Sequence, residues 1–187
     1  MRYSAREMLS NDIDWFFSTS DGFAVHVASA GGFLPKFVEK ERTRKIREKL
    51  LSQIHGFYIS LNESKFYQES HIRLNLLDKI EINENALSRI WDHQRNFFDE
   101  ENPDHTHDWQ EDYLLSFCVM ANCGFISFDR MYVEDNTLNF YQWIADGSQN
   151  ILKGDVREEL PKIQVSLNEL KNENTDWIEL LNMRNPA

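Results

Sequence analysis

The most chemically suggestive stretch of the sequence is DEENPDHTHDWQED at residues 99–112, which holds seven acidic residues, two histidines and no Lys or Arg. Carboxylates and imidazoles are common ligands of divalent metals. If a helix begins at Pro103, residues two apart point about 200° away from each other, so the two histidines do not bind one ion together. His105, Asp108 and Asp112 share a helix face instead, and these three are the candidate metal ligands.

The same stretch has a plainer interpretation, which we favour. Acidic residues gather at helix N-termini because the helix dipole stabilises negative charge there. We therefore predict no metal and no cofactor. On this interpretation the carboxylates form an exposed acidic surface, and the residues expected to contact a partner are Asp99, Glu101, Asp104 and Asp108. Such a surface attracts a basic protein and steers its approach.

Two single residues, His26 and Asp129, are also candidates for chemistry. His26 sits between two alanines in an apolar stretch, and Asp129 interrupts the apolar run GFISFDRM. A buried imidazole needs a hydrogen-bond partner, and a buried carboxylate is costly unless it is paired. If the protein is an enzyme, these two are its candidate catalytic residues. The competing interpretation is that each belongs to a satisfied structural network.

The element that must position His26 is a hairpin at about residues 13–29. Its two apolar runs flank Asp21 and Gly22, a pair suited to a two-residue turn. With the turn at this pair, Phe17 lies opposite His26. Both faces of the hairpin are apolar, so we expect both to be covered.

A second hairpin, at residues 124–146, is expected to position Asp129. Placing its turn at residues 135–136 pairs Phe128 with Trp143 and brings Asp129 opposite Gln142. Several favourable cross-strand pairs result from this single register.

Apolar residues at helical spacing predict helices between and after the hairpins. The expected ranges are 36–54, 83–98, 102–122 and 174–181. Residues 57–82 contain alternating apolar residues and are predicted to form two or three short strands. The predicted fold class is therefore α+β, with antiparallel hairpins in a sheet packed against three or four helices, and residues 1–187 form a single domain.

Composition excludes several classes of protein. The chain has 187 residues, a formal net charge of −11, and 13 Phe, 6 Tyr and 5 Trp. This aromatic content argues against disorder, and the charge argues against nucleic-acid binding. No apolar run is long enough to span a membrane, so we expect no membrane association. Two cysteines, Cys118 and Cys123, without an apolar leader suggest free thiols in the cytoplasm.

These observations favour a non-catalytic protein that binds another macromolecule through its acidic surface, as an inhibitor or antitoxin-like factor would. The opposite charge gathers at residues 36–49, which carry seven Lys or Arg and three Glu. The alternative is a small hydrolase-like enzyme that uses His26 with Asp129, or a metal at the candidate ligands. We favour the binding protein, because the sequence yields no clear set of nucleophile, base and orienting group.

Overall fold

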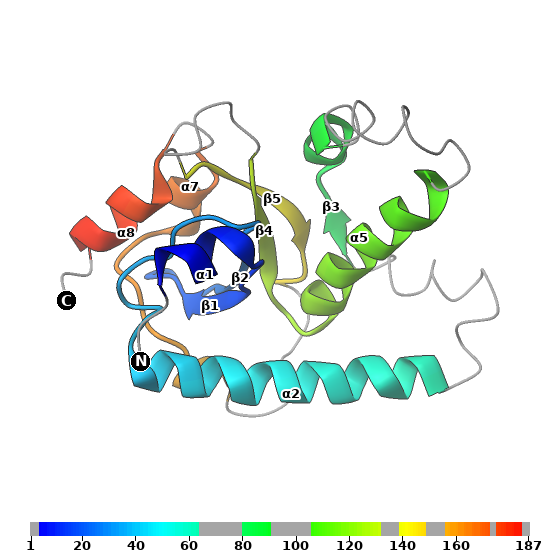
Figure 1. Ribbon diagram of the computed structural model, residues 1–187, viewed down its shortest axis with the longest axis horizontal. Helices are drawn as coiled ribbons and strands as arrows, with labels where there is room; N and C mark the ends of the chain where they lie inside the picture. Colours follow the sequence, from blue (N-terminus) through cyan, green and yellow to red (C-terminus); the bar gives the residue numbers. More distant parts are fainter. Residues whose placement is uncertain are drawn as a thin grey trace.

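The computed structural model describes residues 4–63, 80–90, 106–131, 139–148, 156–172 and 175–184. Its centre is a five-stranded sheet with the strand order β1-β2-β4-β5-β3 (Figure 1). The strands are β1 (Trp15–Ser18), β2 (Ala24–Ala28), β3 (Glu81–Ile82), β4 (Ile126–Arg130) and β5 (Tyr141–Asp146). The sheet and the helices around it confirm the α+β class.

The helices outnumber the three or four that the sequence predicts. They are α1 (Ala5–Ser10), α2 (Glu41–Glu63), α5 (Thr106–Asn122), α6 (Val156–Glu159), α7 (Leu167–Leu170) and α8 (Trp177–Arg184). Residues 84–90 are also helical. None of the described helices combines the length and the apolar character that a membrane crossing requires.

Strands β1 and β2 pair antiparallel, in a register one residue away from the predicted one. His26 lies opposite Phe16, and not opposite Phe17. Because side chains alternate along a strand, a shift of one residue moves a whole strand to the other face. Phe16 therefore shares a face with His26, whereas Phe17 lies on the opposite face. Every residue of both strands is buried, so the sheet is covered on both sides here.

The turn between these strands explains the shifted register. The backbone N–H of Gly22 donates to the carbonyl of Thr19, and Gly22 adopts a φ of +88°. The loop is thus a type I turn that ends in a left-handed glycine, which makes it three residues long. The predicted two-residue turn at Asp21 and Gly22 is wrong.

The centre of the sheet is parallel, which the prediction of antiparallel hairpins did not include. Strand β2 pairs with β4 in parallel, with His26 beside Ser127 and Ala28 beside Asp129. This pairing joins residues about 100 positions apart in the sequence. It brings His26 and Asp129 onto neighbouring strands and onto the same face of the sheet.

Strands β4 and β5 pair antiparallel in the predicted register over most of their length. Phe128 pairs with Trp143 and Asp129 with Gln142. A bulge between Ser127 and Phe128 shifts the register toward the start of β4. The predicted turn at residues 135–136 lies outside the described residues.

The largest difference between the predicted and the observed secondary structure is at helix α2. It begins at Glu41 and continues to Glu63, where a helix over 36–54 followed by strands was expected. The alternating stretch FYISL at residues 57–61 is therefore helical. Only β3 remains as a strand within residues 57–82, and residues 64–79 lie outside the described residues.

The prediction for α5 agrees with the structure at its C-terminal end, whereas α8 begins and ends three residues after the predicted range 174–181. Helix α5 ends at Asn122, followed by Gly124 with a φ of +87°. The N–H groups of Gly124 and Phe125 donate to the carbonyls of Ala121 and Met120, which is the Schellman arrangement that closes a helix. The short C-terminal helix is present as α8.

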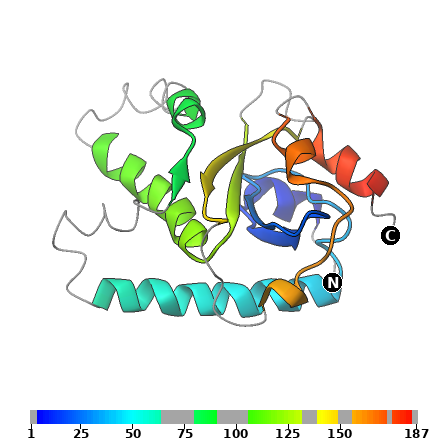
Figure 2. The ribbon, with the colours of Figure 1, turned by 180° about the vertical axis from the view of Figure 1, so that it is seen from behind.

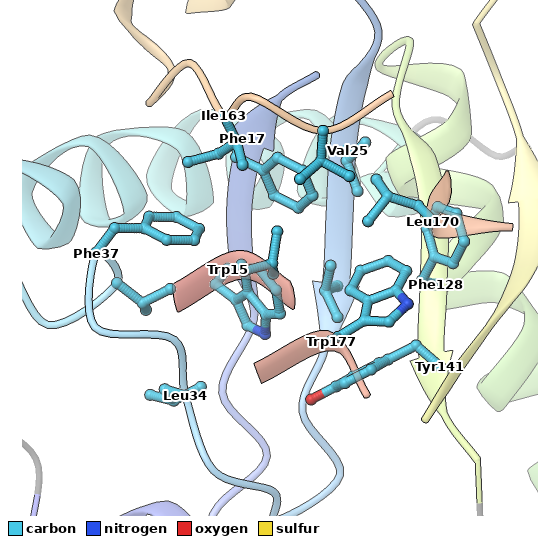
Figure 3. Close-up of a cluster of buried hydrophobic side chains, with 14 of the residues drawn as sticks. Trp15, Phe17, Val25, Leu34, Phe37, Phe128, Tyr141, Ile163, Leu170 and Trp177 are labelled. Carbon is cyan, nitrogen blue, oxygen red and sulfur yellow. The ribbon is translucent and has the colours of Figure 1, made fainter. Parts of the chain in front are cut away.

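The two faces of the sheet are covered by different helices. One face packs against α7, α8 and the residues around Phe37, and its centre is an aromatic cluster (Figure 3). In this cluster the ring centroid of Trp177 lies 4.8 Å from that of Tyr141 and 6.3 Å from that of Trp15. The other face packs against α2, α5 and residues 84–90. His26 and Asp129 lie on this second face.

Candidate functional site

His26 lies at the centre of a buried chain of polar side chains. Its Nε2 is 2.9 Å from Asp14 Oδ1, and its Nδ1 is 3.2 Å from Ser127 Oγ. A carboxylate accepts, so Nε2 carries a proton, and in the neutral ring the Ser127 hydroxyl donates to Nδ1. Asp14, His26 and Ser127 are the residue types of a hydrolase triad, in which a histidine links an acid to a hydroxyl.

The two ends of this chain differ in their access to solvent. The side chain of Asp14 is 34% exposed, whereas Ser127 is 0% exposed. Arg47 of α2 donates from its Nε to the Asp14 carbonyl, which ties the helix to the start of β1. Burial raises the pKa of Asp14, but the hydrogen bond and charge of His26 and the charge of Arg47 outweigh burial, so that the pKa lies below its usual value.

Asp129 has its own partners on the same face. Its Oδ2 is 2.5 Å from the hydroxyl of Tyr113 on α5, and its Oδ1 accepts from the backbone N–H of Arg130 at 2.8 Å. Burial raises the pKa of Asp129 to about 7, and the charges of Asp12 and Asp14 also raise it. The hydrogen bonds from Tyr113 and Arg130 act in the opposite direction but are weaker.

The pKa of Tyr113 is shifted by the same buried surroundings. Burial raises the pKa of its hydroxyl, and the neighbouring charge of Asp129 raises it further. Tyr113 therefore remains protonated and links α5 to the sheet at neutral pH.

His26 and Asp129 lie on the same face but use different partners. His26 binds Asp14 and Ser127, whereas Asp129 binds Tyr113 and the backbone of Arg130. Both are buried, with 2% and 8% of their surface exposed. The prediction of a buried histidine with a hydrogen-bond partner is confirmed. The polar groups around both residues fix helices to the sheet, and their catalytic role stays a hypothesis.

Three members of these networks were not foreseen from the sequence. They are Asp14, Tyr113 and Ser127. Asp14 stands immediately before β1, and Ser127 lies between two apolar residues of β4, so both interrupt apolar patterns. A signal was therefore present, but the partner of each depends on strand pairing that the sequence does not reveal.

The paired glycines after β2 form a turn. The N–H of Gly32 donates to the carbonyl of Ser29, while Ala30 and Gly31 adopt φ values of 44° and 73°. This is a type I′ turn. A Cβ on Gly32 would lie 2.9 Å from both Cδ of Arg130 and the carbonyl oxygen of Ser29, so any other residue here would force these groups to shift. The two glycines therefore serve the turn, and the sequence around them contains no phosphate-binding motif.

The candidate metal ligands and docking residues fall largely outside the described residues. Asp99, Glu101, Asp104 and His105 precede the first described residue of α5. Asp108 and Asp112 belong to the helical backbone of α5, and their side chains are not described. Within the described part of the chain, no three His, Cys, Asp or Glu side chains are grouped to hold a metal.

Both cysteines are free thiols in the structure. Burial raises the pKa of Cys118 to about 12 and that of Cys123 to about 11. Neither thiol ionises near neutral pH, so neither has the character of a nucleophile.

Two adjoining surface pockets lie beside the first turns of α2. A groove of about 500 Å³ runs between this helix and residues 158–163. A second hollow of about 510 Å³ adjoins it and shares Arg42, Ile46 and Glu159 with it. We name the two together the α2 groove. Its lining residues are Phe37, Lys40, Glu41, Arg42, Thr43, Lys45, Ile46, Lys49, Glu158, Glu159, Leu160, Pro161, Lys162 and Ile163. Neither His26 nor Asp129 is among them.

Comparison with known proteins identifies no relative. No family model, no curated protein and no solved structure matches the chain. The geometry of the chain's own residues is therefore the basis for a functional proposal.

Proposed function

We propose that this chain is a non-catalytic macromolecule-binding protein of the cytoplasm, acting as an inhibitor or antitoxin-like factor on a basic protein. The observation that carries the proposal is that the two candidate catalytic side chains are occupied by structural hydrogen bonds. His26 and Asp129 are buried, and their polar atoms hydrogen-bond to other side chains and to backbone of the same chain. A catalytic acid or base must reach a substrate atom within hydrogen-bond distance.

The proposed docking surface is the acidic segment at residues 99–112, represented by Asp99, Glu101, Asp104 and Asp108. The segment leads into α5, which Tyr113 links to the sheet through Asp129. A rigid helix that continues from the segment limits the entropy lost when a partner binds. Seven carboxylates within fourteen residues favour a basic partner and fast, salt-sensitive association.

The experiment is capture of partners from a native lysate with wild type and with the variant Asp99→Lys/Glu101→Lys/Asp104→Lys. The matched control is Glu48→Lys/Glu84→Lys/Glu179→Lys, which makes the same change of net charge at exposed sites of the described surface. We expect a basic partner that wild type and control both retain and that the first variant loses. Capture should weaken as salt rises, because exposed charges are screened beyond about 8 Å at physiological ionic strength.

Two results would contradict the proposal. One is an identical partner list from all three proteins. The other is equal loss of the partner from the docking variant and the control, since that would reflect net charge alone. Melting curves of the three proteins show whether the substitutions also disturb folding.

A second candidate function, a hydrolase-like enzyme, rests on the Asp14–His26–Ser127 chain. Its strongest support is the acid-imidazole-hydroxyl order, and its main weakness is that Ser127 is 0% exposed. The test is hydrolysis of p-nitrophenyl acetate together with labelling by a fluorophosphonate probe. Labelling of Ser127 that requires His26 would favour the enzyme over the binding protein.

A further inference from the structure

The α2 groove combines an apolar floor with a charged rim. The floor is formed by Phe37, Ile46, Leu160 and Ile163, of which Phe37, Leu160 and Ile163 are buried. In Figure 2, α6 lies beside the N-terminal half of α2. The hydrogen-bonded ion pair between Lys49 and Glu159, 2.6 Å long, joins the two walls. The groove is therefore bounded by elements that are fixed to each other.

The rim has cations that form no ion pair with the described part of the chain. Lys45 and Lys49 are paired with Glu41 and Glu159. Lys40, Arg42 and Lys162 are exposed, and none of them is paired with a carboxylate of the described residues. The lining also holds Glu158, so its five cations and three carboxylates give a net charge of +2, a local reversal of sign in a chain of net charge −11.

The start of α2 strengthens this positive field. The helix has 23 residues and begins at Glu41, directly after Lys40. Its first N–H groups point toward the end that the rim surrounds, and the helix dipole places partial positive charge there. An acidic polypeptide segment with an apolar side chain matches both the rim and the floor.

We propose that the α2 groove binds the acidic segment at residues 99–112 of a second copy of this chain. The inference rests on the proposed function, because it takes the same acidic segment as the docking surface and identifies the basic surface that it meets as the α2 groove of another molecule of the same protein. The segment carries seven acidic residues, no Lys or Arg, and one large apolar residue, Trp109. Its charge complements the three rim cations that no described carboxylate pairs with.

The arrangement in the fold favours contact between copies. The Thr106 end of α5 and the Glu41 end of α2 lie at opposite ends of the molecule in both views (Figures 1 and 2). A second copy brings its acidic segment to the groove without any rearrangement of the first. The two surfaces are different, so the contact is heterologous and either closes into a ring or propagates.

The test is analytical ultracentrifugation of full-length variants over a range of concentration. The groove variant is Lys40→Glu/Arg42→Glu, and the segment variant is Asp99→Lys/Glu101→Lys/Asp104→Lys. The first should fold normally, since acidic residues are favoured in the first turn of a helix. The control for net charge is Arg89→Glu/Arg184→Glu, which reverses two exposed cations away from the groove, of which Arg184 is paired with Glu169.

We expect wild type and control to self-associate, with dissociation as salt rises. Each of the other two variants should stay monomeric by itself. Their equimolar mixture should form a 1:1 complex, because one supplies an intact segment and the other an intact groove.

Three outcomes would overturn the inference. They are monomeric wild type at every concentration, self-association that the groove variant retains, and a mixture that forms no complex. Failure here is distinguishable from failure of the proposed function. If wild type is monomeric but still captures a different basic protein through its acidic segment, only this inference falls.

Discussion

The two faces of the sheet are built by different means. The face under α7 and α8 is an aromatic cluster around Trp15 and Trp177, in which shape and apolar area provide the stability. The face under α2 and α5 carries His26, Ser127 and Asp129 among its apolar residues. On this second face, side-chain hydrogen bonds link α2 and α5 to the sheet, whereas the first face is mainly apolar packing, with the start of α8 also held by hydrogen bonds to the backbone of Asn139.

Both faces hold buried polar atoms without a hydrogen-bond partner among the described residues, Ser18 and Gln142 on the polar face included, but on the polar face His26 and Asp129 are fully paired. Among the described residues, Nε1 of Trp15, Nε1 of Trp177 and the hydroxyl of Tyr141 are buried without a hydrogen-bond partner. His26 uses both ring nitrogens and Asp129 uses both oxygens. The comparison indicates that substitutions on the first face act through volume and that substitutions on the second act through unsatisfied polar groups.

The largest expected effect comes from Trp177→Ala on the aromatic face. Trp177 is 0% exposed, and its removal leaves a cavity against Trp15, Phe128 and Tyr141. We expect a loss of about 3–5 kcal/mol in the free energy of unfolding, measured in urea. Met183→Ala, at a 65% exposed position on the same helix, is the control and should change little. A small effect of Trp177→Ala would mean that this face does not depend on packing.

The next effect is expected from His26→Leu on the polar face. Leucine keeps the volume but leaves the buried Ser127 hydroxyl without its partner, at a cost of about 1–3 kcal/mol. Adding Ser127→Ala removes the unsatisfied group and should recover part of that loss. Urea unfolding of both variants measures it. If the second substitution adds further destabilisation, the hydrogen bond is not the source of the effect.

Asp129→Asn should change how stability depends on pH. The pKa of Asp129 is raised to about 7 in the folded protein, above its ordinary value of 3.8. The folded state therefore holds this proton more tightly, and the stabilisation is fully present below about pH 4 and lost as pH rises through about 7. From pH 5 to pH 8 wild type should lose about 1–3 kcal/mol relative to the variant.

Urea unfolding at several pH values measures this difference. Glu84→Gln, an exposed carboxylate outside the network, serves as the control. Parallel pH profiles for wild type and Asp129→Asn would show that Asp129 ionises as an ordinary exposed carboxylate does.

The smallest effect is expected at the turn after β2. Ala30 has a φ of 44°, a conformation that costs an alanine about 1–2 kcal/mol. Ala30→Gly removes that strain but adds flexibility to the unfolded chain, so we expect a net gain of about 0.5–1 kcal/mol. Thermal unfolding should show a slightly higher Tm. A lower Tm would indicate that the alanine side chain makes a contact worth more than the strain.

The sequence predicted the parts of the fold that depend on local pattern. The Phe128–Trp143 register follows from two apolar runs close in sequence, and the end of α5 follows from Gly124. The β1–β2 register was missed because it depends on whether the loop has two or three residues. The alternating residues at 57–61 predict a strand, but this stretch continues a long helix.

The candidate site was foreseen only in part, for a different physical reason. A buried His26 and a buried Asp129 are visible as polar residues in apolar runs. Their partners are not, because the His26–Ser127 contact depends on the parallel pairing of strands that are 101 residues apart. A local pattern contains no information on which strands become neighbours.

The central claim is that the buried polar groups support the fold and that binding occurs at the charged surface. The most direct test measures partner capture and ester hydrolysis on wild type, Ser127→Ala and the Asp99→Lys/Glu101→Lys/Asp104→Lys variant. We predict that Ser127→Ala captures the partner as wild type does, that the charge-reversed variant does not, and that no hydrolysis depends on Ser127. Hydrolysis that Ser127→Ala abolishes, together with capture that the charge-reversed variant retains, would contradict the account.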